Sequence, residues 1–223
     1  MTVVYEDNHI IIVNKTASEI VQGDKTGDTP LSETVKQYLK EKYSKPGNVF
    51  IGVAHRLDRP VSGLVVFAKT SKALSRLNEM FKNSEVKKTY WAVVKNLPRE
   101  EEGGIGDYLV RNEKQNKELC IRQGGAGQQE SDFALPAHRA VAELLSVGNR
   151  FENRTPSPDT LSVGKDGLSH QGDLKYGSPR SNPDGSICLH ARYIRFVHPV
   201  SKEPIEVEAP VPPGNLWNGF ETI

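Results

Sequence analysis

The residues best suited to chemistry lie in one short run, His55-Arg56-Leu57-Asp58-Arg59-Pro60-Val61-Ser62-Gly63. This run places the carboxyl group of Asp58 between the guanidinium groups of Arg56 and Arg59. Because neighbouring cations favour the charged form of a carboxyl group, we expect Asp58 to be ionised and able to act as a nucleophile or as a base. The alternative is that Asp58 is a turn residue or an N-cap ahead of the apolar segment Leu64–Ala68.

A second segment, residues 86–94, shows the alternation of a half-buried strand and carries Lys88 and Tyr90. Taken alone, these two residues are interpreted as an exposed lysine and a buried aromatic residue of a strand. A role in a functional site depends on whether this strand meets the run that contains Asp58.

Both segments resemble motifs of the RluA-type RNA pseudouridine synthases. Residues 55–63 resemble HRLDxxTSG, with Val61 where the family usually has threonine, and residues 86–92 resemble VxKxYxA. The resemblance implies that Asp58 is the catalytic residue, that Tyr90 packs on the target base and that Lys88 is the motif lysine. His55, Arg56 and Arg59 are further candidates for contact with RNA, and for each arginine a structural brace of the loop is the alternative.

Further matches extend this resemblance over roughly residues 3–116 and 172–211. The opening Val3–Val13 resembles the family's first strand pair, residues 172–177 resemble GDxxYG, and residues 189–199 resemble LHAxxLxFxHP. The implied fold is α+β, with a mixed, largely antiparallel, bent sheet flanked by helices. We expect one catalytic domain over residues 1–223 without the family's S4 module, and neither a cofactor nor a metal.

Several elements must position the candidate site. Two β-branched runs around Glu6–His9 predict a hairpin, and Lys15 at its end is interpreted as a solvated charge or as an RNA contact. Thr29-Pro30 predicts an N-cap and first turn of a helix, and a second helix is expected from Thr70 or Ser71. The apolar faces of these two helices are predicted to contain Leu31, Val35, Tyr38 and Leu39, and Leu74, Leu77 and Phe81, respectively.

The resemblance stops between Lys117 and Gly172. Residues 123–130 are polar and rich in glycine, residues 154–159 have no strand or helix period, and only residues 140–145 could form a short helix. A structureless segment of this length inside a compact domain is unusual. We therefore expect residues 118–171 to be anomalous and poorly ordered.

Back-translation offers a reason for this break. Synonymous codons for residues 118–171, read one base later, give alternating strands, then GRHHQIR, then CPIKG, all of which resemble the missing family segment. We infer that this segment is an out-of-frame reading bounded by two compensating insertions or deletions. The arginine codon of HQIR would straddle Thr160 and Leu161, and in the family this arginine pairs with the catalytic aspartate.

The overall composition limits the classes of partner. Lysine and arginine total 29 against 28 for aspartate and glutamate, so the net charge is +1 and any nucleic-acid contact requires a local basic patch. Two cysteines, Cys120 and Cys188, make neither a disulfide framework nor a zinc site. Without a signal peptide or a membrane-spanning run, we expect a cytoplasmic protein. We also expect a monomer, and the resemblance implies rRNA or tRNA as its substrate. An inactive RNA-binding relic and a partly misfolded frameshift product are the alternatives.

Overall fold

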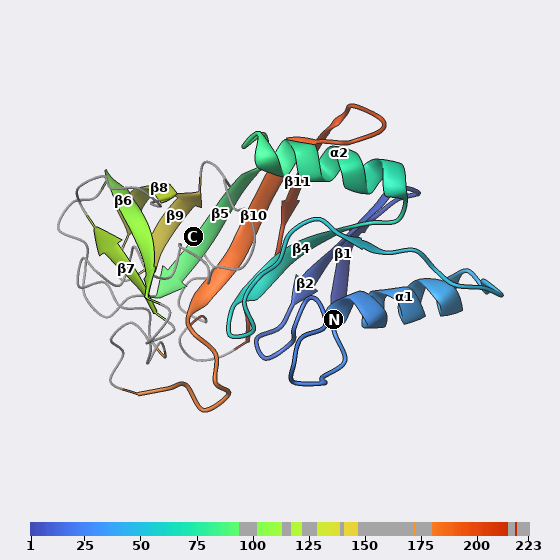
Figure 1. The fold of residues 1–223 in the computed structure, drawn as a ribbon, viewed down its shortest axis with the longest axis horizontal. Helices are drawn as coiled ribbons and strands as arrows, with labels where there is room; N and C mark the ends of the chain where they lie inside the picture. Colours follow the sequence, from blue (N-terminus) through green and yellow to red (C-terminus); the bar gives the residue numbers. More distant parts are fainter. Residues whose placement is uncertain are drawn as a thin grey trace.

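The computed structural model describes residues 1–93, 102–112, 117–121, 129–138, 141–146, 172, 180–213 and 217. These described ranges contain two helices and eleven strands (Figure 1). In chain order they are β1 (Thr2–Glu6), β2 (Ile10–Lys15), α1 (Leu31–Lys42), β3 (Gly52–Val53), β4 (Ser62–Ala68), α2 (Ser71–Lys82), β5 (Lys87–Val93), β6 (Glu102–Asn112), β7 (Lys117–Ile121), β8 (Gln129–His138), β9 (Val141–Ser146), β10 (Leu189–Val197) and β11 (Pro204–Glu208).

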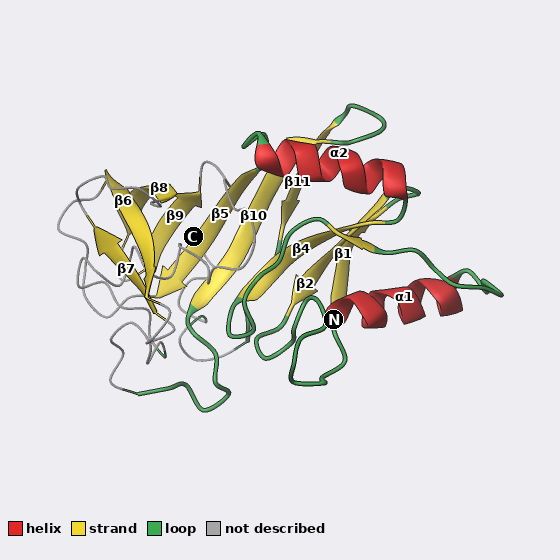
Figure 2. Ribbon diagram, in the orientation of Figure 1, coloured by secondary structure: helices red, strands yellow, loops and turns green. Residues whose placement is uncertain are grey.

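All the described strands belong to one sheet, whose main path runs β1-β2-β4-β10-β5-β9-β8-β6-β7. Strand β11 pairs with β10 and β3 pairs with β4. Among the strand pairs of the described ranges, only β4 and β10 run parallel. The expected α+β fold with a mixed, largely antiparallel sheet is therefore confirmed, and Figure 2 shows the two helices flanking this sheet.

The two helices cover opposite faces of the sheet. Side chains alternate between the two faces along each strand, so each helix packs on a different set of strand residues. In β2, Ile11 and Val13 belong to the apolar cluster that contains α1, whereas Ile10 and Ile12 belong to the cluster that contains α2. All four side chains are fully buried. Covering on both faces explains why β2 and β4 read as continuous apolar runs rather than as alternating ones.

The hairpin and both helices were predicted correctly, with one difference in detail. The hydroxyl of Thr70 accepts a hydrogen bond from the amide of Ala73, so α2 has the expected cap. The cap predicted at Thr29 is wrong: Pro30 is the N-cap residue of α1, and no side chain caps that helix. Proline has no amide hydrogen to donate, so it fits both the N-cap position and the first position of a helix. The sequence alone did not show which of these two positions Pro30 takes.

The segment after β5 differs from the prediction. Residues 141–146 form strand β9 rather than a helix, and β9 pairs antiparallel with β5 from Lys88 to Val93. A short apolar run fits a buried strand and a helical turn equally well, and here pairing with a long neighbouring strand decides between them. Within the segment 118–171, residues 118–121, 129–138 and 141–146 are strands, and the remaining positions lie outside the described residues.

Candidate active site

Four strands meet in one row at the start of β4, immediately after the run that contains Asp58. The register of the sheet pairs Lys15 of β2 with Gly63 of β4, Gly63 with Ala191 of β10, and Ala191 with Tyr90 of β5. Lateral neighbours in a sheet project to the same face. The row therefore brings Lys15 and Tyr90 from distant parts of the chain to one end of the sheet, beside the loop that carries Asp58.

Gly63 permits this meeting of strands. Its φ angle is +118°, a conformation that residues with a side chain rarely adopt. A Cβ atom at this position would lie 2.4 Å from the backbone nitrogen and oxygen of Ala191. The glycine of the run His55–Gly63 is thus required for the close approach of β10, and not for the chemistry of the site.

The loop before β4 is held by its main chain. The carbonyl oxygen of Asp58 accepts from the amide of Val61 at 3.1 Å, which closes a turn. The oxygen of Arg59 accepts from the amide of Ser18 at 2.8 Å, and that of Pro60 from the amide of Ile187 at 3.1 Å. Segments from three parts of the chain therefore fix this loop, as a preorganised catalytic group requires.

Lys15 completes this support. Its side chain is fully buried, and its ammonium group donates to the carbonyl oxygens of Thr16, Arg59 and Val61 at 3.0, 3.1 and 2.5 Å. Both sequence-based interpretations of Lys15, a solvated charge and an RNA contact, are wrong, because the β2–β4 pairing buries this strand end. Lys15 clamps the Asp58 loop instead.

Burial also changes the acidity of Lys15. Loss of solvent lowers the pKa of Lys15 to about 8, although the carboxylates of Glu19 and Asp58 oppose this shift. The charge of Lys15 therefore acts on Asp58. Three carbonyl oxygens accept from the ammonium group, and its charge interacts with the carboxylates of Glu19 and Asp58.

Asp58 lies in the turn that residues 58–61 form, so the turn interpretation is correct for its backbone. Its side chain is exposed, whereas the preceding Leu57 is buried in the α1-side cluster. The loop thus anchors itself through Leu57 and leaves the carboxylate of Asp58 accessible to a substrate.

Tyr90 and Lys88 lie on the neighbouring strand β5. Tyr90 is 2% exposed and Lys88 is 8% exposed, so the expectation of an exposed lysine is wrong. The ammonium group of Lys88 lies 5.6 Å from the centroid of the Tyr90 ring, within the range of a cation–π contact. The two motif residues of this strand therefore form one buried pair at the end of the sheet that holds Lys15.

The side chain of His55 contacts strand β4 and helix α2. Its Nε2 atom accepts the amide hydrogen of Val66 at 3.0 Å, and its ring centroid lies 4.7 Å from that of Phe81 in α2. Burial lowers the pKa of His55 to about 3, and the charge of Lys88 lowers it further. A neutral imidazole that caps a strand amide supports a structural role for His55.

The two arginines beside Asp58 differ in their surroundings. Arg59 forms an ion pair with Asp28 at 2.6 Å and donates to Thr26 at 3.0 Å, which supports the interpretation as a brace. Arg56 is exposed, and within the described ranges its guanidinium group makes no ion pair or hydrogen bond. Of the two, Arg56 is thus the better placed to meet a phosphate group.

A second buried polar contact, which sequence reasoning missed, joins β4 to β10. The hydroxyl of Ser62 and Nδ1 of His190 lie 2.9 Å apart, and His190 is fully buried. Burial lowers the pKa of His190 to about 4, so the ring is neutral. Serine and histidine in the two matched motifs were the available signal, because the sheet pairs these two residues directly.

Comparison with known protein families identifies the family of this chain. The model of the family described as RNA pseudouridylate synthase matches residues 9–147, more than half of the chain. The chain belongs to this family of RNA-modifying enzymes. The match includes the Asp58 loop, the hairpin strand that carries Lys15, and the Lys88–Tyr90 pair.

Individual relatives carry related names. The chain is 29% identical over 242 residues to tRNA pseudouridine synthase C of Vibrio cholerae, covering 99% of this chain and 94% of that protein. It is 26% identical over 225 residues to ribosomal large subunit pseudouridine synthase D of Zymomonas mobilis, covering 95% and 69%.

Solved structures show the same fold. Human RNA pseudouridylate synthase domain containing 4 matches with a TM-score of 0.73 and 17% identity, over 95% of this chain and 88% of that one. Human RNA pseudouridylate synthase domain containing 1 matches with a TM-score of 0.66 and 22% identity, over 95% and 83%.

The described residues contain neither a membrane-spanning helix nor a cluster of metal-binding side chains. In these ranges no helix has the length and apolar character needed to cross a bilayer. Nor do the same ranges contain a group of three or more histidine, cysteine, aspartate or glutamate side chains placed to hold a metal ion.

Proposed function

We propose that this protein isomerises uridine to pseudouridine in structured RNA, either rRNA or tRNA, with Asp58 as the catalytic carboxylate. The observation that carries the proposal is the row from Lys15 through Gly63 and Ala191 to Tyr90, which joins the Asp58 loop to the aromatic strand. Membership of the RNA pseudouridylate synthase family supports the reaction class. The proposal includes a cytoplasmic monomer that uses no cofactor and no metal.

The reaction breaks the bond from C1′ to N1 of uracil and forms a bond from C1′ to C5. N1 gains a proton and C5 loses one, so no oxidant or reductant is consumed. Asp58 would act as a nucleophile or as the base that triggers cleavage of the glycosidic bond. Its exposed side chain and rigid main chain suit either role.

The target base must leave the helical stack before it can reach Asp58, at a free-energy cost of about a few kcal/mol. Tyr90 would stack on the extruded base and limit access of water, with Lys88 supporting its ring. Because the ring is 2% exposed, the base would have to displace side chains that cover Tyr90. Arg56 would bind a flanking phosphate, since its guanidinium group is exposed beside Asp58. In this proposal Arg59 and His55 act as braces of the loop.

We also propose that residues 118–171 are an out-of-frame reading of the family segment that contains HQIR. The match to the family model continues past Lys117 to residue 147, further than expected, and ends before the position at Thr160 and Leu161 where the frame-restored arginine would fall. The chain as written also contains Arg150, Arg154 and His170, but nothing in their spacing places them opposite Asp58 in the role of the HQIR arginine. The missing arginine favours a second candidate function for the chain as written, that of an RNA-binding relic with little activity.

A direct comparison tests both candidates. The chain as written and a frame-restored version are incubated with bulk RNA, and pseudouridine is quantified by nucleoside mass spectrometry. Activity in the restored chain that disappears in Asp58→Asn supports the enzyme and its catalytic residue. Absence of pseudouridine from a folded, restored chain would contradict the proposed reaction, while sequencing reads across both junctions show whether the shift is in the gene.

A further inference from the structure

The connection that leaves α1 begins and ends with an exposed aromatic side chain. Tyr43 is 48% exposed and Phe50 is 47% exposed, and both belong to the small group of large apolar side chains that the described part of the chain exposes. Neither is used by the site around Asp58. Exposed aromatic rings beside basic side chains are typical of surfaces that bind single-stranded nucleic acid.

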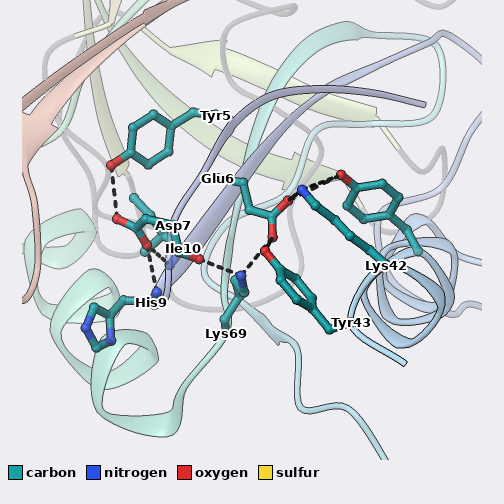
Figure 3. A network of polar contacts seen from close by, with 9 residues as sticks. Tyr5, Glu6, Asp7, His9, Ile10, Lys42, Tyr43 and Lys69 are labelled. Carbon is teal, nitrogen blue, oxygen red and sulfur yellow. Dashed lines mark hydrogen bonds and ion pairs between the residues drawn. The ribbon is translucent and has the colours of Figure 1, made fainter. Parts of the chain in front are cut away.

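Lysines surround the first of these rings. The ammonium groups of Lys42, Lys45 and Lys69 lie 5.5, 5.6 and 5.1 Å from the centroid of Tyr43. The hydroxyl of Tyr43 donates to Glu6 at 2.7 Å, and Figure 3 shows the ring beside Lys69 with its hydroxyl turned toward Glu6. The carboxylate of Glu6 pairs with Lys42 and Lys69, and Lys45 adds a third ammonium group beside the ring, so these four side chains carry an excess of positive charge.

The end of α1 holds this surface rigidly. Ser44 has a φ angle of +47°, and its amide donates to the carbonyl oxygen of Glu41 at 3.2 Å. The amide of Lys45 donates to the carbonyl oxygen of Lys40 at 3.0 Å, which completes a Schellman motif. Because Tyr43 and Lys45 flank the ordered Ser44, little conformational entropy would be lost when a ligand binds them.

We propose that Tyr43, Lys45 and Phe50 form a docking surface for a single-stranded segment of the substrate RNA, outside the site that holds the target uridine. Aromatic rings stack on bases of any identity, and lysines neutralise the phosphates between them. A net charge of only +1 means that RNA binding depends on local patches such as this one. The inference rests on the proposed function, because it takes RNA as the partner.

The position of the surface defines how much RNA is needed to reach it. Helix α1 has 12 residues and is therefore about 18 Å long. Asp28, which pairs with Arg59 of the Asp58 loop, precedes this helix in the sequence, and Tyr43 follows its last residue. A stacked strand advances about 3.4 Å per nucleotide, so about five nucleotides span the length of α1. RNA that is shorter than this cannot occupy the Asp58 loop and the docking surface together.

The test measures binding of the full chain to a fluorescent single-stranded RNA that is well over five nucleotides long, by anisotropy. We expect Tyr43→Ala and Phe50→Ala each to weaken binding about tenfold, as for loss of one base–aromatic stack. Tyr43→Phe keeps the ring and should bind like wild type.

Lys45→Ala should reduce the slope of log K against log salt by about 1, as for loss of one phosphate contact. A thermal unfolding curve for each variant checks that the fold is retained.

Two control variants separate the possible failures. Lys72→Ala removes an exposed charge from α2, and an effect equal to that of Lys45→Ala would show diffuse attraction and overturn the docking surface. Arg56→Ala reports on the site beside Asp58. If Arg56→Ala weakens binding while Phe50→Ala does not, the docking surface is wrong and the proposed function stands. If wild type does not bind the probe, the docking surface is wrong, whereas the proposed function is decided by the pseudouridine assay on bulk RNA.

Discussion

The β1–β2 hairpin carries a buried charge at each end, and the two charges are compensated in opposite ways. At the open end, Lys15 is met by three neutral carbonyl groups. Near the turn, Glu6 accepts from the ammonium groups of Lys42 and Lys69 at 2.7 and 2.9 Å (Figure 3). Neutral carbonyl groups leave the net charge of Lys15 uncompensated, so it still attracts nearby carboxylates. Ion pairs with lysines neutralise the charge of Glu6, so its effect on other groups is small.

The acidity of the two groups follows from this difference. Burial alone would raise the pKa of Glu6, but hydrogen bonds from Lys42, Lys69 and Tyr43 outweigh it and lower that pKa to about 2. Burial lowers the pKa of Lys15 to about 8, because carbonyl groups replace water only in part. We infer that the turn end is structural, and that the open end exists to hold and polarise the Asp58 loop.

The largest effect is expected from replacing Asp58, the residue that the open end of the hairpin supports. In the frame-restored chain, Asp58→Asn should lower the rate of pseudouridine formation at least about 10²–10⁴-fold, since it removes the group that starts the chemistry. The side chain is exposed, so the free energy of unfolding should stay within about 0.5 kcal/mol of wild type. Single-turnover assays and urea denaturation measure the two quantities, and near-normal turnover would remove Asp58 from the mechanism.

Restoring the reading frame tests whether Lys15 suffices as the cation for Asp58. Breaking a buried ion pair costs about 3–5 kcal/mol. If about 3 kcal/mol of this falls on the transition state, the chain as written should be roughly a hundredfold slower than the restored chain. Equal rates on the same RNA would contradict the out-of-frame reading and the role of the arginine.

Limited proteolysis extends this test to the anomalous segment. We expect the first cuts in the chain as written near residues 124–127 or 155–158, since these stretches are polar and rich in glycine or proline. The restored chain should resist the same protease. Protection of both stretches in the chain as written, with cutting elsewhere, would show that the segment folds.

Replacing Lys15 tests how much its buried charge at the open end contributes to stability and to activity. Lys15→Met should lower the free energy of unfolding by about 2–4 kcal/mol at pH 7, because three buried carbonyl groups lose a charged donor. The frame-restored variant should also lose activity, through a looser Asp58 loop. Lys15→Arg keeps the charge without the geometry, so equal stability of wild type and Lys15→Arg would show that charge alone matters.

The pH dependence of Lys15 has a definite sign. The folded state releases the proton near pH 8 and the unfolded chain releases it near 10.5, so the unfolded chain binds more protons between these values. The free energy of unfolding of wild type should therefore rise with pH in this window, by up to about 3 kcal/mol relative to Lys15→Met. Urea denaturation at a series of pH values measures the difference, and parallel curves would contradict the lowered pKa.

The smallest effect is expected at the turn end. Glu6→Gln should lower the free energy of unfolding at pH 7 by about 1–2 kcal/mol, after allowance for solvent screening of its lysine partners. The folded pKa lies below the ordinary value, so the contribution of Glu6 is present above pH 4.5 and is lost as the pH falls toward 2. The two proteins should converge in stability at low pH, and the catalytic rate at pH 7 should not change.

Local pattern in the sequence was enough to predict the hairpin and both helices, and the resemblance of its motifs implied the class of sheet and the family. Asp58 and Tyr90 became candidates because each lies in a motif whose residues are close in the chain. The prediction failed for β9, because a run of six residues fits a strand and a helical turn equally well until it meets a partner strand.

The role of Lys15 was decided only by the tertiary structure. Its neighbours in the sequence, Asn14 and Thr16, are polar and suggested an exposed strand end. Pairing of β2 with β4 places Lys15 opposite Gly63, 48 positions further along the chain, and buries it beneath the Asp58 loop. The sequence determined which residues could perform the chemistry, whereas the register of strands that are distant in the chain decided which of them meet, since burial depends on contacts that no local pattern records.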